Sequence, residues 1–262
     1  MDDIHLQFTE VERSDGILTI TINRPEVLNA LHLAAYAELS RIFDLYALDP
    51  ELRVAIVTGA GDRGFCVGTD LKSLAQTGPY DYPKGGFGGI TKRFDLWKPV
   101  IAAVNGLCLG GGVEILAACD LAVASEHAEF ALPEPLVGQA ALGGVALQRL
   151  ARHLPLKEAM YLALTAQRIS AGEAHRIGLV NQVAPRGEVL AQARALAHKI
   201  LACAPLSIEA TKQVMLQSLE LPGLEAAIQA HYPAAQRMLA SEDAVEGPLA
   251  FAQKRKPQWK GR

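Results

Sequence analysis

Alternation of apolar and polar residues marks the first regular element of the chain. Leu18, Ile20 and Ile22 alternate with threonines ahead of a proline at position 25, which predicts a strand. Apolar residues then recur at three- and four-residue spacing across residues 30–48, as in an amphipathic helix. Short, mainly apolar runs follow, typical of strands covered on both faces in a parallel sheet: residues 54–58, 100–104 and 121–124.

After about residue 145, helical periodicity replaces the short apolar runs. Helices are predicted over residues 156–163, 171–177, 189–204, 206–219 and 224–238. Ser170 followed by Glu173 forms a capping-box pattern at one of these starts. Glycines and prolines interrupt both periodicities between residues 76 and 89, where we expect a mobile loop. The patterns predict an α/β chain with a strand-rich first part and a mainly helical second part.

The composition is that of an ordinary globular enzyme. Of the 262 residues, 50% are apolar and 20% are charged, and the net charge of −3 lacks the positive field that nucleic-acid binding usually exploits. The four cysteines show no metal-ligand spacing with the seven histidines, so we expect neither a zinc site nor a disulfide framework. The sequence shows no targeting pattern and no long apolar segment. We therefore expect no membrane span and a cytoplasmic location.

A glycine-rich turn follows the strand predicted at residues 54–58. It has the G-x-G-x-x-G spacing of a dinucleotide-binding fingerprint over residues 59–64. That fingerprint also requires a helix opening at the third glycine, and Phe65-Cys66-Val67-Gly68 is a poor helix start. The expected acidic residue, about 20 positions on, falls in the irregular segment at Asp81. We therefore interpret residues 59–64 as a tight turn.

Two further stretches place glycine where a backbone would approach a ligand closely: residues 64–70 and 110–112. Each follows a predicted strand and precedes a helix. Unpaired N–H groups at helix N-termini carry partial positive charge, so two such sites can converge on one developing oxyanion. Together they indicate a site for acyl transfer or enolate formation. For either stretch alone, a turn or tight packing is the alternative explanation.

Two isolated carboxylates accompany these glycines. Glu114 follows the triple glycine in an otherwise apolar segment, and Glu134 lies between Pro133 and Pro135 after another apolar run. A carboxylate in apolar surroundings should have a raised pKa, which suits proton transfer near neutral pH. The alternatives are that Glu114 only complements the helix dipole and that Glu134 is an exposed turn residue.

Taken in order, these segments resemble the crotonase (enoyl-CoA hydratase/isomerase) superfamily nearly from end to end. The motifs that carry the resemblance are Ile22-Asn23-Arg24-Pro25 with Asn29-Ala30-Leu31, residues 65–72, Asn105-Gly106 with residues 110–114, and Pro133-Glu134. The resemblance implies a crotonase-like spiral of repeated β-β-α units with the active site over residues 1–200. It also implies a C-terminal helical trimerisation region over residues 201–262, and a homotrimer or a dimer of trimers.

The resemblance also assigns roles to single residues. The amides of Thr69 and Gly111 would bind the thioester oxygen, while Glu114 would activate a water and Glu134 would protonate the α-carbon. Contacts with the acyl-CoA are implied for Arg24, Val27, Gly68, Asp70, Leu71, Lys72, Gly110, Pro133 and Leu142. For Lys72, an ordinary surface lysine is the alternative. No metal or separate cofactor is implied, because coenzyme A is part of the substrate.

Residues 241–251 and 259–262, with Gly85-Gly86-Phe87, resemble the carnitinyl-CoA dehydratase branch of this family in particular. A substrate of that branch ends in a quaternary ammonium, which aromatic faces can bind. The aromatic residues that would form such a cage, or instead pack hydrophobically, are Tyr80, Tyr82, Phe87, Phe94 and Trp97. Thr69 stands where a small residue is usual and Leu142 near a usual pocket glycine, so the acyl preference is open.

The presence of both glutamates favours addition or removal of water across the 2,3 double bond of an acyl-CoA thioester. One alternative is an enoyl-CoA double-bond isomerase that uses Glu134 alone. Another is a catalytically silent acyl-CoA-binding or trimer-scaffold protein. An RNA-binding role is disfavoured by the pI of about 6.2.

Overall fold

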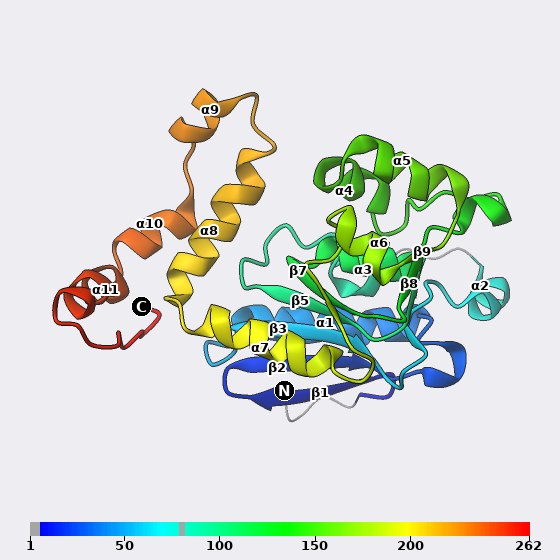
Figure 1. The fold of residues 1–262 in the computed structure, drawn as a ribbon, viewed down its shortest axis with the longest axis horizontal. Helices are drawn as coiled ribbons and strands as arrows, with labels where there is room; N and C mark the ends of the chain where they lie inside the picture. The colour runs from blue at the N-terminus through cyan, green and yellow to red at the C-terminus, as the bar shows by residue number, and fades with distance from the viewer. Residues whose placement is uncertain (1–5, 79–81) are drawn as a thin grey trace.

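Two sheets form the centre of the computed structural model, which describes residues 6–78 and 82–262 (Figure 1). Their strands are β1 Thr9–Ser14, β2 Ile17–Ile22, β3 Val54–Gly59, β4 Gly64–Cys66, β5 Val100–Val104, β6 Leu107–Leu109, β7 Leu121–Ser125, β8 Glu129–Ala131, β9 Ile169–Ser170 and β10 Gln182–Ala184. Within the described ranges the larger sheet has the order β1-β2-β3-β5-β7-β10 and the smaller has the order β4-β6-β8-β9. In the larger sheet, only the β1–β2 pair is antiparallel.

The chain winds as a spiral, and each of its central turns, beginning at β3, β5 and β7, gives one strand to each sheet and then a helix. The helices are α1 Leu33–Leu48, α2 Leu71–Thr77, α3 Gly111–Ala118, α4 Ala146–His153, α5 Leu156–Thr165, α6 Ala171–Arg176, α7 Val189–Leu201, α8 Pro205–Ser218, α9 Leu224–Gln229, α10 Pro233–Leu239 and α11 Glu242–Ala252. Short 3₁₀ turns are η1 Pro25–Val27, η2 Phe87–Gly89 and η3 Glu134–Val137. The units β3-β4-α2 and β5-β6-α3 confirm the β-β-α spiral expected from the sequence.

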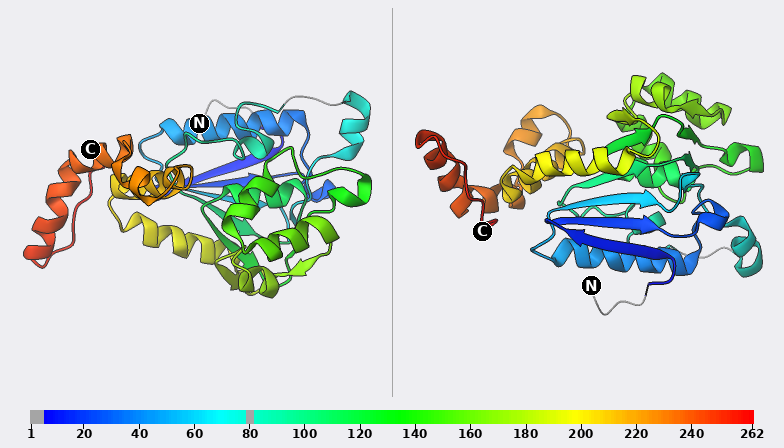
Figure 2. Two further views of the ribbon diagram at one scale, coloured as in Figure 1. Left: turned by 90° about the horizontal axis from the view of Figure 1, so that it is seen from above. Right: turned by 60° about the horizontal axis from the view of Figure 1, so that its bottom comes forward.

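Both faces of the larger sheet are buried, as the apolar runs predict. Ala55 and Val57 of β3 belong to the core cluster that includes the inner face of α1. Val54 and Ile56 point the other way and pack in the cluster that contains Ala193 of α7. Helices α1 and α7 accordingly lie on opposite sides of the strands (Figure 2). Removal of apolar area on both sides of each central strand is the main force that holds the spiral together.

Helices α8–α11 extend beyond the sheets to one side (Figures 1 and 2). The Lys212 ammonium of α8 ties this arm to the core, donating to Asp120 Oδ2 at 2.7 Å and to the Lys98 carbonyl at 3.0 Å. The arm carries many large apolar side chains that are exposed: Met215, Leu216, Leu219, Leu224, Ile228, Leu239, Val245, Leu249 and Phe251. Scattered exposed apolar residues are ordinary, whereas large groups of them are typical of surfaces that take part in protein–protein contacts.

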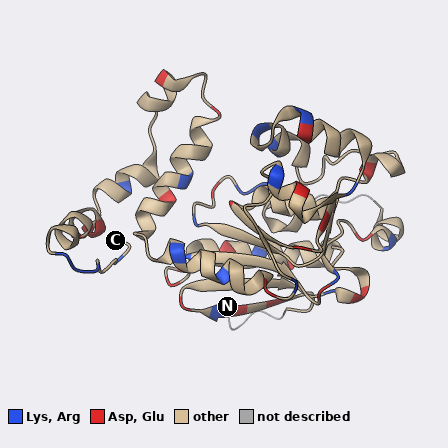
Figure 3. Cartoon of the chain, viewed as in Figure 1, with Lys and Arg blue, Asp and Glu red and all other residues tan. Residues whose placement is uncertain are grey.

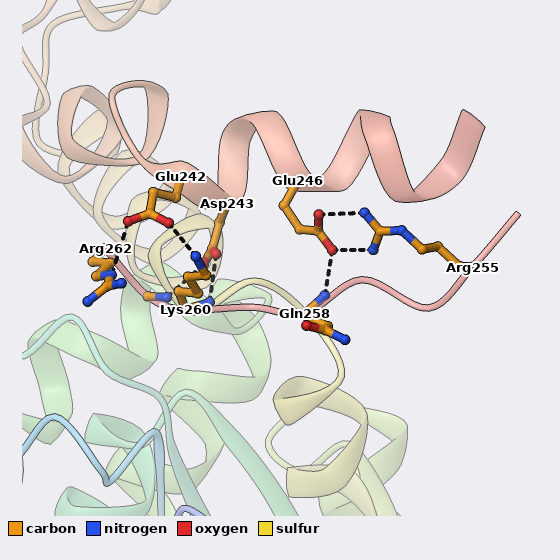
Figure 4. Close-up of polar contacts among 8 residues, drawn as sticks. Glu242, Asp243, Glu246, Arg255, Gln258, Lys260 and Arg262 are labelled. Carbon is orange, nitrogen blue, oxygen red and sulfur yellow. Dashed lines mark hydrogen bonds and ion pairs between the residues drawn. The ribbon is translucent and has the colours of Figure 1, made fainter. Parts of the chain in front are cut away.

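The segment after α11 folds back along that helix (Figure 4). The buried Asp243 carboxylate accepts the N–H groups of Lys260 and Gly261 at 2.7 and 2.9 Å. Glu246 forms a two-bond ion pair with Arg255 at 2.6 and 2.8 Å. Because Glu246 and Arg255 lie at the surface, the Asp243 contacts are the stronger restraint on the path of this segment.

Two helix predictions are wrong in their boundaries. The helix expected from residue 30 begins at Leu33, because Leu31 pairs with Thr69 and the His32 side chain caps the helix by accepting the Ala35 N–H. The single helix expected over residues 224–238 is two helices, α9 and α10. Pro233 has no N–H to continue a helix and instead occupies the first turn of α10.

The mobile loop expected at residues 76–89 is also only partly correct. Residues 79–81, including Tyr80 and Asp81, lie outside the described residues. Residues 85–89 are fully buried, and the Phe87 ring packs 4.9 Å from the Tyr36 ring. The glycines here reflect close packing rather than freedom, since a Cβ on Gly89 would lie 2.4 Å from the Ser40 nitrogen.

The turn at residues 59–64 joins β3 to β4, so a strand and not a helix follows the third glycine. The buried Asn105 side chain holds it: Oδ1 accepts the Gly59 N–H at 3.1 Å, and Nδ2 donates to the Gly59 and Gly61 carbonyls at 2.8 Å each. The interpretation as a tight turn is confirmed. The helix that a dinucleotide-binding fingerprint requires after the third glycine is replaced by strand β4.

Replacement of Asn105 by alanine should lower the free energy of unfolding by about 2–3 kcal/mol, because several buried backbone groups lose their partner. Urea denaturation measures this loss. Asn23→Ala is the control, since the Asn23 side chain is bonded to Glu10 at the exposed surface, and it should cost less than about 1 kcal/mol. Equal losses in the two variants would contradict the role given to Asn105.

Candidate functional site

Residues 68–70 run beside Leu31 as a short parallel bridge. The Leu31 N–H donates to the Gly68 carbonyl, and the Asp70 N–H donates to the Leu31 carbonyl, both at 2.8 Å. The Gly68 carbonyl and the Thr69 N–H belong to one planar trans peptide group, in which the C=O and the N–H point in opposite directions. The Thr69 N–H, which lies between these two groups, therefore points away from Leu31.

The start of helix α3 lies directly against this segment. Gly110 turns the chain with a φ of 53°, and its N–H donates to the Ala131 carbonyl at 2.9 Å. A Cβ on Gly68 would lie only 3.0 Å from the Gly111 nitrogen. Gly111 is the first residue of α3, so its N–H has no acceptor within the helix. The two predicted amide donors are thus on backbone segments that touch.

Close packing against neighbouring atoms requires glycine at positions 111 and 112. A Cβ on Gly112 would lie 2.0 Å from the Cys66 carbonyl oxygen, and one on Gly111 would lie 2.1 Å from Phe87 Cζ. Both distances are well below any carbon contact, so no side chain fits at either position. Tight packing, the alternative explanation for these glycines, is confirmed at Gly111 and Gly112, and the approach of a ligand to this backbone stays a prediction.

Glu114 lies in the first turn of α3 and is only 3% exposed. Burial raises the pKa of its carboxyl to about 7, against hydrogen bonds from the Gly144 and Ala146 backbones and with the Glu134 charge adding to the rise. Its Oε1 is buried and has no hydrogen-bond partner among the residues of the described ranges. The raised pKa expected from the sequence is confirmed.

Glu134 opens the 3₁₀ turn η3 after Pro133 and is half-buried. Burial raises its pKa, and its Oε2 is a second buried oxygen without a partner in the part of the chain that is described. Its Oε1 would lie 3.0 Å from a Cβ on Gly110. Glu134 therefore borders the α3 start from the side of β8, and the expected exposed-turn alternative is wrong.

The residues expected to contact acyl-CoA differ in their surroundings. Leu71 and Lys72 have exposed side chains at the start of α2, Val27 is half-buried in η1, and Leu142 is 62% exposed. Gly68, Gly110 and Pro133 border the amides and Glu134, as described above. Their contacts with acyl-CoA stay a prediction.

Arg24 and Asp70 bind each other. Arg24 Nη2 donates to Asp70 Oδ2 at 2.9 Å and Nη1 donates to the Ala30 carbonyl at 2.5 Å. Burial raises the pKa of Asp70, but the hydrogen bonds from Arg24 and Ser73 outweigh burial and lower it overall. Asp70 also caps α2 by accepting the Ser73 N–H. The pair thus orients the segment that carries Thr69.

Phe87 and Phe94, two described members of the expected aromatic cage, have different surroundings. Phe87 is 1% exposed and packs with Tyr82 and Tyr36, at ring distances of 5.9 and 4.9 Å. Phe94 is 73% exposed and lies against the Arg149 guanidinium. Hydrophobic packing, the alternative given for this cluster, describes Phe87, whereas Phe94 is an exposed ring beside a guanidinium.

The sequence patterns did not identify two residues that lie next to the site. Gly144 packs on Glu114, with a hypothetical Cβ 2.4 Å from Oε2, and Tyr36 places its hydroxyl 3.3 Å from Thr69 Oγ1. The glycine pair 143–144 was a signal for the first. Tyr36 gave no signal, because it falls on the apolar stripe of a helix like any core residue.

This arrangement can stabilise negative charge on an acyl oxygen and move protons next to it. In the described ranges no group of three or more His, Cys, Asp or Glu side chains is placed to hold a metal ion. No helix there is long and apolar enough to cross a membrane. The fold and site define a protein of the crotonase class, built around paired amide donors and paired carboxylates.

Comparison with known proteins agrees with this class. The family model for enoyl-CoA hydratase/isomerase matches residues 12–262, and the chain belongs to this family. Carnitinyl-CoA dehydratase of Escherichia coli strain K12 is 43% identical over 95% of this chain and 97% of its own length. The crystal structure of enoyl-CoA hydratase EchA1 from Mycobacterium marinum has a TM-score of 0.91 at 41% identity, covering 97% of this chain and 99% of that one. For carnitinyl-CoA hydratase from Mycobacterium avium the TM-score is 0.78 at 41% identity, covering 98% and 100%.

The raised pKa of Glu114 predicts a pH dependence of stability. The folded chain holds this proton more tightly than the unfolded chain, so stability should fall as pH rises from about 4.5 to about 7. Glu114→Gln removes the titration, and the natural protein should lose about 3 kcal/mol relative to this variant across that window. Urea denaturation at a series of pH values measures the difference, and parallel curves would contradict the burial effect.

Proposed function

We propose that the protein is an enoyl-CoA hydratase/dehydratase that adds or removes water across the 2,3 double bond of an acyl-CoA thioester. The proposal is carried by the buried Glu114 carboxylate and the half-buried Glu134 carboxylate beside two outward amide donors. Each carboxylate has a buried oxygen with no hydrogen-bond partner among the described residues. Hydration needs a base for water and an acid for the α-carbon on one site, together with a place for the enolate oxygen. Family membership supports the same chemistry.

In the proposed mechanism the thioester oxygen accepts hydrogen bonds from the Thr69 and Gly111 amides. Glu114 removes a proton from the water that attacks the β-carbon, and Glu134 gives a proton to the α-carbon. The roles reverse in dehydration. Each oxyanion donor contributes about 10²- to 10³-fold, and each proton-transfer group about 10²- to 10⁴-fold. The reaction uses no metal and no cofactor beyond the coenzyme A of the substrate.

For the substrate we propose an acyl group like that of the carnitinyl-CoA dehydratases to which this chain is 43% identical. The coenzyme A part would pass the backbone at Gly68, Gly110 and Pro133 and the exposed start of α2 at Leu71 and Lys72. Arg24 and Asp70 would contribute as a pair. The Arg24 guanidinium is already bound to the Asp70 carboxylate, so each would hold the other in place. Val27 and Leu142 would lie along the edges of the substrate path.

Residues 201–262 are proposed to form the trimerisation region, and residues 1–200 the core that holds the active site. The exposed apolar side chains of the α8–α11 arm support this assignment, because a second and third copy would remove them from water. We propose a homotrimer or a dimer of trimers.

The chemistry of the surface and the thiols supports two further assignments. Basic and acidic residues are mixed over the described chain (Figure 3), which favours a small-molecule substrate over nucleic acid. The described residues contain Cys66, Cys108, Cys119 and Cys203 as free thiols. Free thiols are typical of a reducing compartment, so we propose a cytoplasmic enzyme.

Purified protein should consume crotonyl-CoA or crotonobetainyl-CoA, measured as loss of the conjugated enoyl-thioester absorbance. Glu114→Gln and Glu134→Gln should each be at least about 10²-fold slower, because each removes a proton-transfer group. Glu129→Gln, which alters a carboxylate paired with Arg168 at the surface, is the control and should retain activity.

The two substitutions separate the proposal from its rivals. Isomerisation by Glu134 alone would survive Glu114→Gln and would appear as a migrated double bond without added water. Tight binding of both thioesters without turnover would indicate an acyl-CoA-binding protein. Either result would overturn the hydratase proposal.

The assembly proposal predicts a particle mass of three or six times the 28.0 kDa of the chain. Sedimentation velocity measures it. Phe251→Asp together with Leu239→Asp should shift the particle toward single chains, because each places a charge on an apolar surface that the partner copies would cover. A single-chain mass for the natural protein would contradict the trimer.

A further inference from the structure

Tyr36 of helix α1 is fully buried beneath the site, and its ring and its hydroxyl touch different segments. The hydroxyl lies 3.1 Å from the Leu31 carbonyl oxygen and 3.3 Å from Thr69 Oγ1. The ring packs 4.9 Å from the Phe87 ring. No part of Tyr36 is open to a substrate, so any role in catalysis must act through its neighbours.

The proton positions at this hydroxyl follow from the acceptors. The Leu31 carbonyl can only accept, so the single phenol proton goes to it. With the phenol proton on the Leu31 carbonyl, the Thr69 hydroxyl is the donor to the Tyr36 oxygen. The Leu31 carbonyl also accepts the Asp70 N–H at 2.8 Å. Tyr36 is therefore linked to the segment that carries Thr69 in two ways, directly through the Thr69 side chain and indirectly through the Leu31 carbonyl that accepts the Asp70 N–H.

The ring side of Tyr36 reaches the second amide donor. Phe87 packs on Tyr36 and occupies the space where a Gly111 side chain would be, with its Cζ 2.1 Å from that hypothetical Cβ. Tyr36 and Phe87 are thus a continuous buried bridge from Thr69 to Gly111. Close-packed rings do not compress, so the bridge sets how near the two backbone segments can come.

We propose that Tyr36 is a positioning residue that fixes the Thr69 amide relative to the Gly111 amide, with the Thr69 hydroxyl as its attachment. This rests on the proposed function. It also gives a reason for a threonine at position 69, because alanine, glycine or valine would lack the hydroxyl that bonds to Tyr36. Amide donors stabilise an oxyanion only within about 2.7–3.1 Å, so a small displacement weakens the transition state more than it weakens binding.

Four variants test the proposal: Tyr36→Phe, Thr69→Val, the double variant, and Thr69→Ser, which keeps a hydroxyl. We expect kcat to fall about 10-fold in either single variant, less than full loss of a donor would cause, with KM changed less than about 2-fold. The double variant should be no slower than the singles, because both remove the same bond. Thr69→Ser should restore most of kcat.

Tyr46→Phe is the matched control. Tyr46 lies on the same helix, is fully buried, and donates to the Pro99 carbonyl at 2.7 Å in another part of the core. Its loss should lower stability like that of Tyr36→Phe and leave kcat unchanged. Equal loss of kcat in the two tyrosine variants, additive losses in the double variant, or unchanged kcat in Tyr36→Phe would overturn the proposal.

A second measurement does not depend on turnover. Butyryl-CoA cannot be hydrated, and the stretching frequency of its thioester carbonyl reports the strength of the two amide bonds when it is bound. The natural protein should lower this frequency, and Tyr36→Phe should lower it less at nearly the same affinity. A lowered butyryl-CoA frequency in a protein that hydrates neither crotonyl-CoA nor crotonobetainyl-CoA would refute the hydratase proposal alone. An equal frequency in natural protein and Tyr36→Phe would refute the positioning role alone.

Discussion

Close contact between the backbones of residues 66–68 and 110–112 is the constraint on which the rest of the site depends. No Cβ fits at Gly112 against the Cys66 carbonyl, and a Cβ on Gly68 would press on the Gly111 nitrogen. This approach brings the start of α3 beside the bridge between Leu31 and Thr69. Because helix starts and extended bridges each leave particular N–H groups unused, the contact creates a pair of donors without any dedicated side chain.

The same contact dictates where the carboxylates lie. Glu114 is one turn from the glycines on α3, so it is carried into the core with them and its pKa rises through burial to about 7. Glu134 reaches the region from the end of β8, in the neighbouring turn of the spiral. A buried and a half-buried carboxyl group near one another cost stability in their ionised forms. That cost is compatible with a role in proton transfer and is difficult to explain as a contribution to folding.

Different interactions stabilise the central sheets and the extended arm of α8–α11. The larger sheet is covered by α1 on one face and α7 on the other, so its strands need no further partner. The arm of α8–α11 is held by a few polar contacts such as Lys212 with Asp120, and it leaves large apolar side chains exposed. Its own packing does not bury enough apolar surface, which is the physical basis for expecting other copies of the chain around it.

The sequence by itself determined the elements whose patterns are local and strong. The strand at residues 17–22, the buried runs of β3, β5 and β7, the tight turn after β3, and the lone carboxylates Glu114 and Glu134 could all be identified from spacing and composition. Only the tertiary structure decided the contacts between distant segments. Leu31 pairs with Thr69 and delays α1, Phe87 is drawn into the core, Gly144 closes over Glu114, and Tyr36 meets Thr69. These contacts depend on which surfaces meet when the spiral closes. The local sequence around each residue does not encode which distant segment it will meet.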